Sequence, residues 1–269
     1  MNDNEYALLK RKIRDLIGID LEAYKVQQMR RRLDAHVMRN GGDVAAFCRS
    51  VESDASALEE LRNMITINVS EFFRDAAQFQ ALRDQVMPDL LRANTGKLKI
   101  WSAACSHGEE PYSVAIILDE LTAGSRAQIV ATDIDKVVLE KAKIGGPYHP
   151  NEMRNVKPET LQRYFTDTGG GYRVVDTIRK RVEFRELNLL TGRFDRDIDL
   201  IICRNVMIYF SDETKQRLFE RFHESLRPSG VLFVGGTEAL LGAETFGFSR
   251  VSGNFYRRVE LAQRERLSA

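Results

Sequence analysis

The sequence has few of the residues that build disulfide frameworks and metal clusters. Its 269 residues include only three cysteines and four histidines, scattered along the chain, and no Cys-x-x-Cys pair occurs. Few, widely spaced cysteines are typical of free thiols in a reducing compartment, and isolated histidines offer no zinc-binding pattern. We therefore expect free thiols, no metal site and a cytoplasmic location.

Long apolar runs and a strong charge of one sign are also missing. No apolar stretch is long enough to span a membrane, and residues 1–6 are too polar to open a secretion signal. The formal net charge is +1, which argues against a general polyanion binder, so any basic partner surface must be local. The composition predicts no membrane insertion and no nucleic-acid partner.

The chain has enough apolar residues for a large α/β domain with a smaller companion, since 43% of it is hydrophobic. Residues 1 to about 75 show apolar positions at helical spacing, with breaks at glycines. From Leu98 onwards, strand-like runs alternate with helical segments, as in a parallel sheet covered by helices. The expected strands are 98–103, 128–133, 182–185, 199–203 and 231–235.

The last part of the chain departs from this alternation. Two strand-like runs, 246–251 and 254–259, are separated by Ser252-Gly253, which predicts a hairpin. A parallel sheet that ends in an antiparallel hairpin is the architecture of class I S-adenosylmethionine methyltransferases. A dinucleotide dehydrogenase would show a Gly-x-Gly-x-x-Gly motif and a further βαβ unit, and the sequence has neither. A glycine-rich stretch within 163–181 predicts a small inserted hairpin.

A stretch of small residues, 99–113, joins the first expected strand to the next helix. It contains a single Gly108 and places Pro111 in the first helical turn. Such a turn lets a ligand lie against the backbone at the carboxyl edge of a parallel sheet. Asp133 ends the next strand, where it could hold ribose hydroxyls or merely cap the following helix. The stretch is a candidate cofactor site.

Two further segments carry polar patterns. Ser70 is a plausible N-cap for a helix that runs through Phe79 to Leu91. The segment 25–39 contains five basic residues and one acid, and the following stretch, 43–60, is acidic. The basic segment is either a solvated helix face or a docking surface for an acidic partner. Aromatic residues are not interleaved with its charges, which disfavours a single-strand nucleic-acid platform.

Five segments, in this order, resemble the chemotaxis receptor glutamate methyltransferases, the CheR family. They are 66–74 (Thr-Ile-Asn-Val-Ser-Glu-Phe-Phe-Arg), 101–105 (Trp-Ser-Ala-Ala-Cys), 108–113 (Gly-Glu-Glu-Pro-Tyr-Ser), 131–135 (Ala-Thr-Asp-Ile-Asp) and 203–210 (Cys-Arg-Asn-Val-Met-Ile-Tyr-Phe). The resemblance covers essentially the whole chain. It implies an α/β fold with a seven-stranded, mostly parallel Rossmann-like sheet, an antiparallel C-terminal hairpin, a small β-hairpin insertion and an all-α N-terminal domain.

The resemblance also implies a domain organisation and an activity. Residues 1–74 would be a helical receptor-docking domain, 75–96 a linker helix, and 97–269 the S-adenosylmethionine-binding domain with its insertion at about 163–181. The activity would be methyl transfer from S-adenosylmethionine to glutamate side chains on the cytoplasmic helical bundle of chemoreceptors. The product of the cofactor would be S-adenosylhomocysteine, and we expect the protein to be a monomer.

The resemblance assigns roles to individual positions. Cofactor contacts are implied for Asn68, Ser70, Arg74, Glu110, Asp133, Asn188, Leu189, Arg204 and Asn205. Of the pair Glu109 and Glu110, we select the second. Asp133 would hold the ribose, Asn188 and Leu189 would flank the adenine, and Arg204 and Asn205 would lie beside the sulfonium end. Arg74 and Tyr209 are implied to shape the methyl-transfer site, and Arg30, Arg31 and Arg32 to dock the receptor.

Two features depart from the family pattern. His107 stands where the family often has Thr, and its imidazole could touch the cofactor carboxylate or face solvent. The inserted hairpin is short around Gly169–Gly171, so we expect methylation that does not need a receptor peptide tether. Two other functions are weighed: a methyltransferase acting on another protein or nucleic acid, and a non-catalytic adaptor. The sequence lacks an Asn-Pro-Pro-Tyr-type motif after the fourth strand, which disfavours amino-group methylation.

Overall fold

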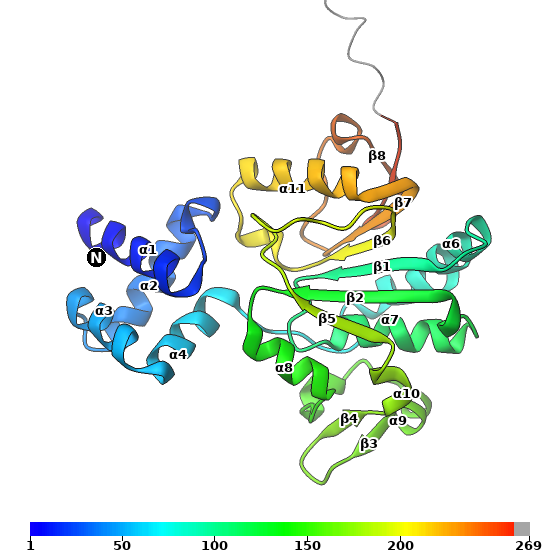
Figure 1. Cartoon of the computed structure of the whole chain (residues 1–269), viewed down its shortest axis with the longest axis horizontal. Coiled ribbons are helices and arrows are strands. Elements are labelled where there is room, and N and C mark those ends of the chain that lie inside the picture. The colour runs from blue at the N-terminus through cyan, green and yellow to red at the C-terminus, as the bar shows by residue number, and fades with distance from the viewer. Residues whose placement is uncertain (261–269) are drawn as a thin grey trace, which may run out of the picture. The chain divides into compact units, whose positions relative to one another are not determined.

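The computed structural model describes residues 1–260, so the end of the predicted methyltransferase domain, 261–269, lies outside the described residues. The chain divides into two compact units (Figure 1). The first comprises Met1–Asn68 together with Ile208–Lys215, and the second comprises Val69–Met207 and the chain from Gln216 onward. The helices of the described part of the chain include none with the length and hydropathy of a membrane span.

The first unit is all helical, as predicted. Its elements are α1 (Asp3–Ile17), the 3-10 turn η1 (Leu21–Ala23), α2 (Val26–Arg39), α3 (Val44–Ser53) and α4 (Ala55–Thr66). A capping box between Asn2 and Glu5 starts α1, and Gly18 ends it in the left-handed conformation. The apolar stripes of the helices bury Leu9, Ile13 and Leu33 completely. The unit is therefore held by its own core.

The segment Ile208–Lys215 is distant in sequence but belongs to this first unit. It pairs with the chain between η1 and α2. The amide of Lys25 donates to the carbonyl of Tyr209 at 2.9 Å, and the amide of Ser211 donates to that of Ala23 at 2.9 Å. The Tyr24 ring packs edge-on against Phe210 with centroids 5.0 Å apart. The sequence alone gives no sign of this association.

The second unit contains a seven-stranded sheet of order β5-β2-β1-β6-β7-β9-β8 (Figure 1). The strands are β1 (Leu98–Ala103), β2 (Ala127–Asp133), β5 (Val182–Glu186), β6 (Ile198–Cys203), β7 (Leu226–Val234), β8 (Phe248–Ser252) and β9 (Phe255–Arg258). The first five of these in the sheet order pair in parallel, and β9 and β8 add the antiparallel hairpin. This confirms the predicted fold class.

Helices cover the sheet and complete the second unit. They are α5 (Ala76–Ala81), the π-helical turn η2 (Leu82–Val86), α6 (Met87–Ala93), α7 (Glu109–Glu120), η3 (Gly124–Arg126), α8 (Lys136–Ile144), η4 (Pro150–Met153), α9 (Pro158–Tyr164), α10 (Asp176–Arg179), η6 (Ala243–Phe246) and α11 (Asp212–Ser225). The first residues of α11 lie in the other unit, as does most of the short turn η5 (Met207–Tyr209).

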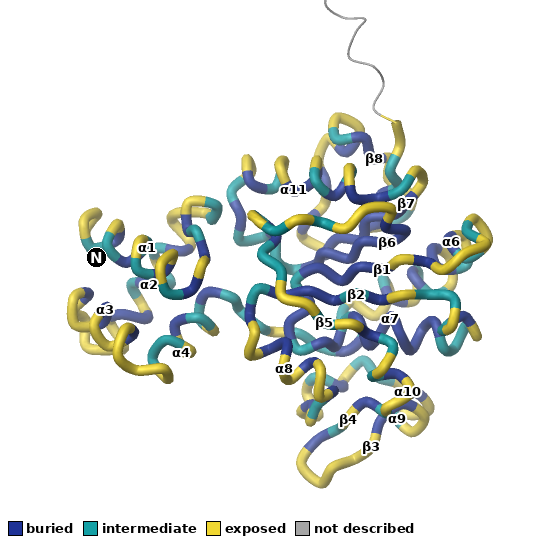
Figure 2. The backbone as a smooth tube through the Cα atoms, in the orientation of Figure 1, coloured by how far each residue is buried: buried dark blue, intermediate teal, exposed yellow. Residues whose placement is uncertain are grey.

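The central strands are buried on both faces, as expected for a parallel sheet between helical layers (Figure 2). Along β1, alternate side chains point to opposite faces. Trp101 packs against Phe194 and the α11 residue Phe222, whereas Ile100 joins the core cluster formed with α5, η2 and α7. Trp101 is therefore a core residue.

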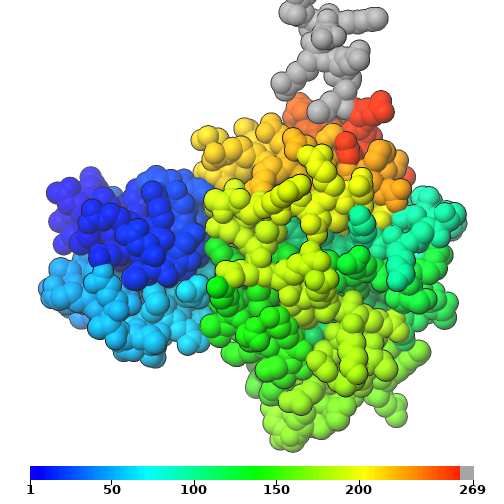
Figure 3. All heavy atoms as spheres, viewed as in Figure 1, coloured from blue at the N-terminus to red at the C-terminus, as the bar shows by residue number. Residues whose placement is uncertain are grey.

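The inserted hairpin is present, formed by β3 (Phe165–Asp167) and β4 (Tyr172–Val174). Its turn is closed by the amide of Thr168, which donates to the carbonyl of Gly171 at 2.9 Å. The hairpin and its neighbours α9 and α10 lie together at one end of the second unit (Figure 3).

Two local predictions are wrong. Ser70 does not cap a helix, because the helical run begins at Ala76 and Asp75 occupies the N-cap position. The residues between them pair with other segments instead: the amide of Phe72 donates to the carbonyl of Glu152, and that of Phe73 to the Ser113 hydroxyl. The strand expected at 231–235 begins earlier, because β7 starts at Leu226, and its register with β6 is irregular before Val231.

Candidate active site

The carboxyl ends of four parallel strands meet at one edge of the sheet. Ala103, the last residue of β1, is in register with Thr132 of β2 and Cys203 of β6. Asp133, the last residue of β2, is in register with Glu186 at the end of β5. The four loops that follow these strands therefore start side by side, at the edge where open α/β sheets bind ligands.

The loops at this edge have strained backbones. Ala104, Ser106 and Asn205 have φ values of 62°, 50° and 59°, which are left-handed although none of the three is glycine. Such conformations are uncommon outside glycine, and they gather at binding and catalytic sites. Their clustering in two adjacent loops supports a functional role for this edge.

Asp133 is buried at the centre of the edge, with 6% of its surface exposed. Its Oδ2 accepts the amide of Ser106 at 2.9 Å, and its Oδ1 accepts the amide of Asp135 at 3.0 Å. Burial raises the pKa of Asp133 to about 6, although these amides favour the charged form. The N-cap of α8 is Asp135, which accepts the amide of Val137. Asp133 is thus not the helix cap, and each of its oxygens has a further lone pair to offer.

Glu110 faces the same edge from the first turn of α7. Its Oε1 accepts the hydroxyl of Ser102 at 2.7 Å, and its Oε2 lies 3.5 Å from Nη1 of Arg204. Burial raises the pKa of Glu110, and Arg204 opposes that shift. The neighbouring Glu109 differs, because it is fully buried. The Ser70 hydroxyl lies near its carboxyl group and favours the charged form, but neither carboxyl oxygen has a partner at hydrogen-bond geometry among the described residues. Burial raises its pKa to about 8.

Arg204 connects three parts of the edge. Its side chain is 2% exposed, and Nη2 donates to the Arg74 carbonyl at 2.9 Å and to Oδ2 of Asp75 at 2.5 Å. The guanidinium carbon also contacts the rings of Phe79 and Phe233, at 5.3 and 4.8 Å from their centroids. With these contacts and Glu110 beside it, Arg204 joins the end of β6 to the segment that precedes α5.

That segment, 69–75, is anchored by aromatic residues. Phe72 is fully buried and packs edge-on against Tyr148 and Phe165, with centroids 4.8 and 4.9 Å apart. Arg74 donates through Nη1 to the carbonyl of Val69 at 3.0 Å, which closes the segment on itself. The anchors fix the backbone and leave the Arg74 side chain only partly buried.

Asn205 is held by Glu238, a residue that the sequence analysis missed. The buried Glu238 accepts the amides of Asn205 at 2.5 Å and of Gly235 at 3.0 Å through the same Oε2. A Cβ on Gly235 would lie 2.3 Å from that oxygen. The only sequence signal was an acid shortly after Gly235-Gly236, at the end of a strand.

Asn188 and Leu189 lie in the loop that follows β5. Asn188 accepts the amide of Leu190 through Oδ1 at 2.8 Å, and Leu189 is buried. Arg221 of α11 restrains this loop. Its guanidinium donates to the carbonyls of Leu189, Leu190 and Gly192. Arg221 also stacks 3.8 Å above the Phe194 ring. It is a second residue that sequence reasoning missed.

His107 is half-buried in the loop after β1. Its Nδ1 lies 3.2 Å from the Ser106 hydroxyl, and its carbonyl accepts the Tyr148 hydroxyl at 2.8 Å. Burial lowers the pKa of His107, which favours the neutral ring. The imidazole therefore does not simply face solvent, and its environment does not favour a positive charge.

The remaining predicted residues lie in the first unit. Asn68 donates to the Thr66 hydroxyl at 3.0 Å. Arg30 donates to Asp3 at 2.7 Å and to the Met1 carbonyl at 2.8 Å. Arg31 is exposed and makes no hydrogen bond or ion pair with any other described residue. The third arginine, Arg32, is partly buried and donates to the carbonyl of Met64.

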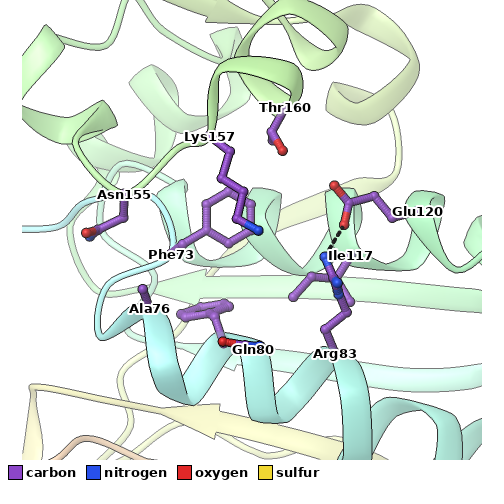
Figure 4. Close-up of a pocket in the computed structure, with 10 residues that line it drawn as sticks. Phe73, Ala76, Gln80, Arg83, Ile117, Glu120, Asn155, Lys157 and Thr160 are labelled. Carbon is purple, nitrogen blue, oxygen red and sulfur yellow. Dashed lines mark hydrogen bonds and ion pairs between the residues drawn. The ribbon is translucent and has the colours of Figure 1, made fainter.

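A cavity of about 130 Å³ lies elsewhere in the second unit, between α5, α7 and the start of α9 (Figure 4). Its lining includes Phe73 and Phe79, together with the ion pair between Arg83 and Glu120 at 3.4 Å. None of the predicted cofactor residues lines it. The candidate site is therefore defined by the edge of the sheet and not by this cavity.

Comparison with known proteins decides the family. Residues 68–256 match the family described as CheR methyltransferase, SAM binding domain, and residues 4–66 match the CheR methyltransferase all-alpha domain. The chain belongs to the CheR methyltransferase family. This confirms the resemblance seen in the sequence and identifies the chain as an S-adenosylmethionine-dependent methyltransferase.

Curated relatives are similar over most of their length. A chemotaxis protein methyltransferase of Listeria monocytogenes is 38% identical over 255 residues, which cover 94% of this chain and 97% of the relative. Chemotaxis protein methyltransferase 1 of Pseudomonas aeruginosa is 41% identical, with 83% and 85% covered. The chemotaxis protein methyltransferase of Escherichia coli is 36% identical, with 88% and 85% covered.

Proposed function

We propose that this CheR-family enzyme transfers a methyl group from S-adenosylmethionine to glutamate carboxylates on the cytoplasmic helical bundle of chemoreceptors, forming methyl esters. The observation that carries the proposal is the chemistry of the strand edge. It gathers buried acids, Arg204 and Asn205, and the described residues there include no acid–base pair arranged to move a proton. The shared description of the relatives as chemotaxis protein methyltransferases supports a receptor substrate.

The residues at the edge fit the proposed cofactor. Asp133 has lone pairs left for ribose hydroxyls, and Glu110 offers a carboxylate to an ammonium group. The loop that carries Asn188 and Leu189 combines an amide with an apolar side chain, which suits an adenine ring. Arg204 already holds Asp75 and the Arg74 carbonyl, so we assign it to holding the 69–75 segment in place.

The proposed reaction needs positioning more than proton transfer. A bound S-adenosylmethionine supplies an electrophilic methyl group on sulfur, and the carbon–sulfur pair of electrons stays with sulfur as the ester bond forms. A glutamate carboxylate, with an ordinary pKa of about 4.3, is already ionised at neutral pH and needs no general base. The work left to the protein is to orient the carboxylate and exclude water.

Arg74 and Tyr209 are our candidates for that orientation. A tight ion pair with an arginine would reduce the nucleophilicity of the substrate carboxylate. Arg74 already donates to the carbonyl of Val69, which restrains the side chain and leaves donors free. We therefore assign Arg74 to positioning the carboxylate rather than clamping it.

Receptor docking is assigned to α2. Its exposed residues include Gln27, Gln28, Arg31 and Arg39, which present amides and unburied positive charge to an acidic helical surface. Of the three predicted arginines, Arg30 and Arg32 donate hydrogen bonds to other residues of the first unit. Arg31 is therefore the best candidate for direct contact with the receptor.

We also propose that methylation is independent of a receptor peptide tether. The β3–β4 hairpin is short, with three residues in each strand, and offers little edge for an added peptide strand. Receptor fragments with and without their C-terminal peptide should be methylated at equal initial rates. A large rate loss on removing the peptide would overturn this part of the proposal.

The deciding experiment is transfer of labelled methyl groups to purified chemoreceptor cytoplasmic fragments. Esters release methanol under mild alkali, so base-labile label is the expected result. A fragment with its methylatable glutamates changed to alanine is the control and should take up no label. Label that survives alkali, or that enters nucleic acid or another protein instead, would contradict the proposal.

A further inference from the structure

Arg32 lies in a different environment from the two arginines that precede it. Arg31 points to solvent and Arg30 pairs with Asp3, but Arg32 is partly buried within the first unit. Its guanidinium carbon lies 5.9 Å from the centroid of the Tyr209 ring. Burial lowers the pKa of Arg32 and the nearby Tyr209 hydroxyl opposes this, which is consistent with their closeness.

The Tyr209 backbone is fixed to the same part of the unit. Its carbonyl accepts the Lys25 amide at 2.9 Å, directly before the first residue of α2. The next residue, Phe210, packs on Tyr24. The backbone at Tyr209 is therefore attached at the start of α2, and its ring is contacted by Arg32, a residue further along that helix.

Arg32 also reaches the end of α4. It donates to the carbonyl of Met64, one of the last-turn carbonyls that have no partner within a helix. This turn precedes Ile67, which ends α4 in a left-handed conformation, and Asn68. The guanidinium thus lies between Tyr209 and the turn that leads to Asn68, both of which are implied to act at the methyl-transfer site.

We propose that Arg32 is a positioning residue for Tyr209, through which α2 couples receptor docking to methyl transfer. The inference rests on the proposed function, because Tyr209 matters only if this chain methylates receptors. On this view two adjacent arginines divide the work. Arg31 binds the receptor from the exposed face of α2, and the partly buried Arg32 holds the Tyr209 ring and the end of α4.

A guanidinium suits this role better than an ammonium group. Its planar face can lie over an aromatic ring while its edge donates to a carbonyl. Partial burial strengthens the attraction between the cation and the ring relative to water. Nη1 of Arg32 is buried and has no hydrogen-bond partner among the described residues, so the Tyr209 ring and the Met64 carbonyl are its main restraints.

The matched variants are Arg32→Gln, Arg32→Lys and Arg31→Gln, each tested with receptor fragments at saturating cofactor. Loss of a partly desolvated cation–π contact should lower kcat by about tenfold in Arg32→Gln, with the receptor KM unchanged. Arg32→Lys should recover only part of kcat. Arg31→Gln should show the opposite pattern, with a higher receptor KM and an unchanged kcat.

A second readout follows Tyr209 without any activity measurement. With 3-fluorotyrosine placed at position 209, the fluorine resonance should shift or broaden in Arg32→Gln and stay in place in Arg31→Gln. A helix-content spectrum and the thermal midpoint identify any variant that fails to fold, and for such a variant Arg32→Lys, the smaller change, carries the test.

The outcomes separate the two proposals. If the wild-type protein does not methylate receptor fragments, the proposed function fails. If the wild-type protein is active and Arg32→Gln keeps the wild-type kcat and the wild-type fluorine resonance, the positioning role of Arg32 is wrong. A raised receptor KM with unchanged kcat in Arg32→Gln would likewise overturn it, because Arg32 would then be a docking residue.

Discussion

Arg204 donates to Asp75 at 2.5 Å, although the two residues are 129 positions apart in the chain. The bond joins the end of β6 to the N-cap residue of α5. The pair is unequal, because the Arg204 side chain is 2% exposed and that of Asp75 is 47% exposed. Arg204 also donates to the carbonyl of Arg74. The contact therefore controls where the candidate active-site segment 69–75 lies.

Asp75→Asn should loosen this segment. We expect a loss of about 1 kcal/mol in the free energy of unfolding, the typical net contribution of one hydrogen bond, because solvent screens the half-exposed Asp75. Binding of S-adenosylhomocysteine should also weaken. Asp84→Asn is the matched control, since Asp84 pairs with Arg83 on the surface of the same helical run and should matter little. Urea unfolding and calorimetric titration measure both effects, and equal behaviour of the two variants would refute the assignment.

Asp133→Asn should weaken cofactor binding with little effect on the receptor KM. Losing charge-assisted bonds to hydroxyls costs about 1.5–3 kcal/mol, or roughly ten- to a hundredfold in the dissociation constant of S-adenosylhomocysteine. Asp135→Asn removes charge from the cap of α8 instead, so it should alter stability without altering affinity. Calorimetric titration of both variants makes the comparison, and unchanged affinity in Asp133→Asn would exclude the ribose role.

Glu109 should make the protein less stable as the pH rises. Burial raises its pKa from 4.5 to about 8, so between these values the folded state binds more protons than the unfolded state. The contribution of Glu109 to the free energy of unfolding is fully present below pH 4.5. It decreases as the pH rises from 4.5 to about 8, and it is lost above about pH 8. Glu109→Gln should flatten this part of the curve and should raise the unfolding free energy at pH 8.5 by a few kcal/mol.

Urea unfolding of the wild-type protein and Glu109→Gln across pH 5–9 measures the slope. Glu224→Gln, a change at an exposed position of α11, is the control and should follow the wild-type curve. Parallel curves for Glu109→Gln and the wild type would show that Glu109 is ionised in the folded protein.

Gly235→Ala should disturb Asn205. The new Cβ would lie 2.3 Å from Oε2 of Glu238 and 3.0 Å from the Asn205 amide nitrogen, so Glu238 must move away from the two amides that it accepts. Overpacking of this kind costs about 1–3 kcal/mol, and cofactor affinity should fall with it. Gly236→Ala is the control, because its Cβ would meet nothing closer than 3.8 Å. Equal thermal midpoints for both variants would contradict the packing argument.

Arg74→Ala should lower the rate of methyl transfer even when the cofactor is saturating, because the substrate carboxylate loses its orienting donor. Arg92→Ala, on the exposed end of the linker helix run, should leave the rate unchanged. Single-turnover transfer to receptor fragments measures the chemical step. A wild-type rate in Arg74→Ala would remove this residue from the mechanism.

Much of the fold could be read from the sequence because its signals are local. Apolar periodicity located the helices of the first unit, and strand–helix alternation located the parallel sheet. The carboxyl ends of adjacent parallel strands must meet, which is why Asp133 accepts the amide of Ser106 in the stretch that the sequence marks as a candidate cofactor site. The Ser70 cap failed because the amides of Phe72 and Phe73 find partners far along the chain, which a local capping rule does not register.

Motifs and short-range periodicity are enough to identify the family, the succession of strands and helices along the chain, and the candidate residues. The contacts among those residues are visible only in the folded protein. Arg204 holds Asp75, and Glu238 holds Asn205. Arg32 faces Tyr209, while Arg31 next to it faces solvent. These partners lie on separate segments, and only long-range packing and the burial of charge bring them together.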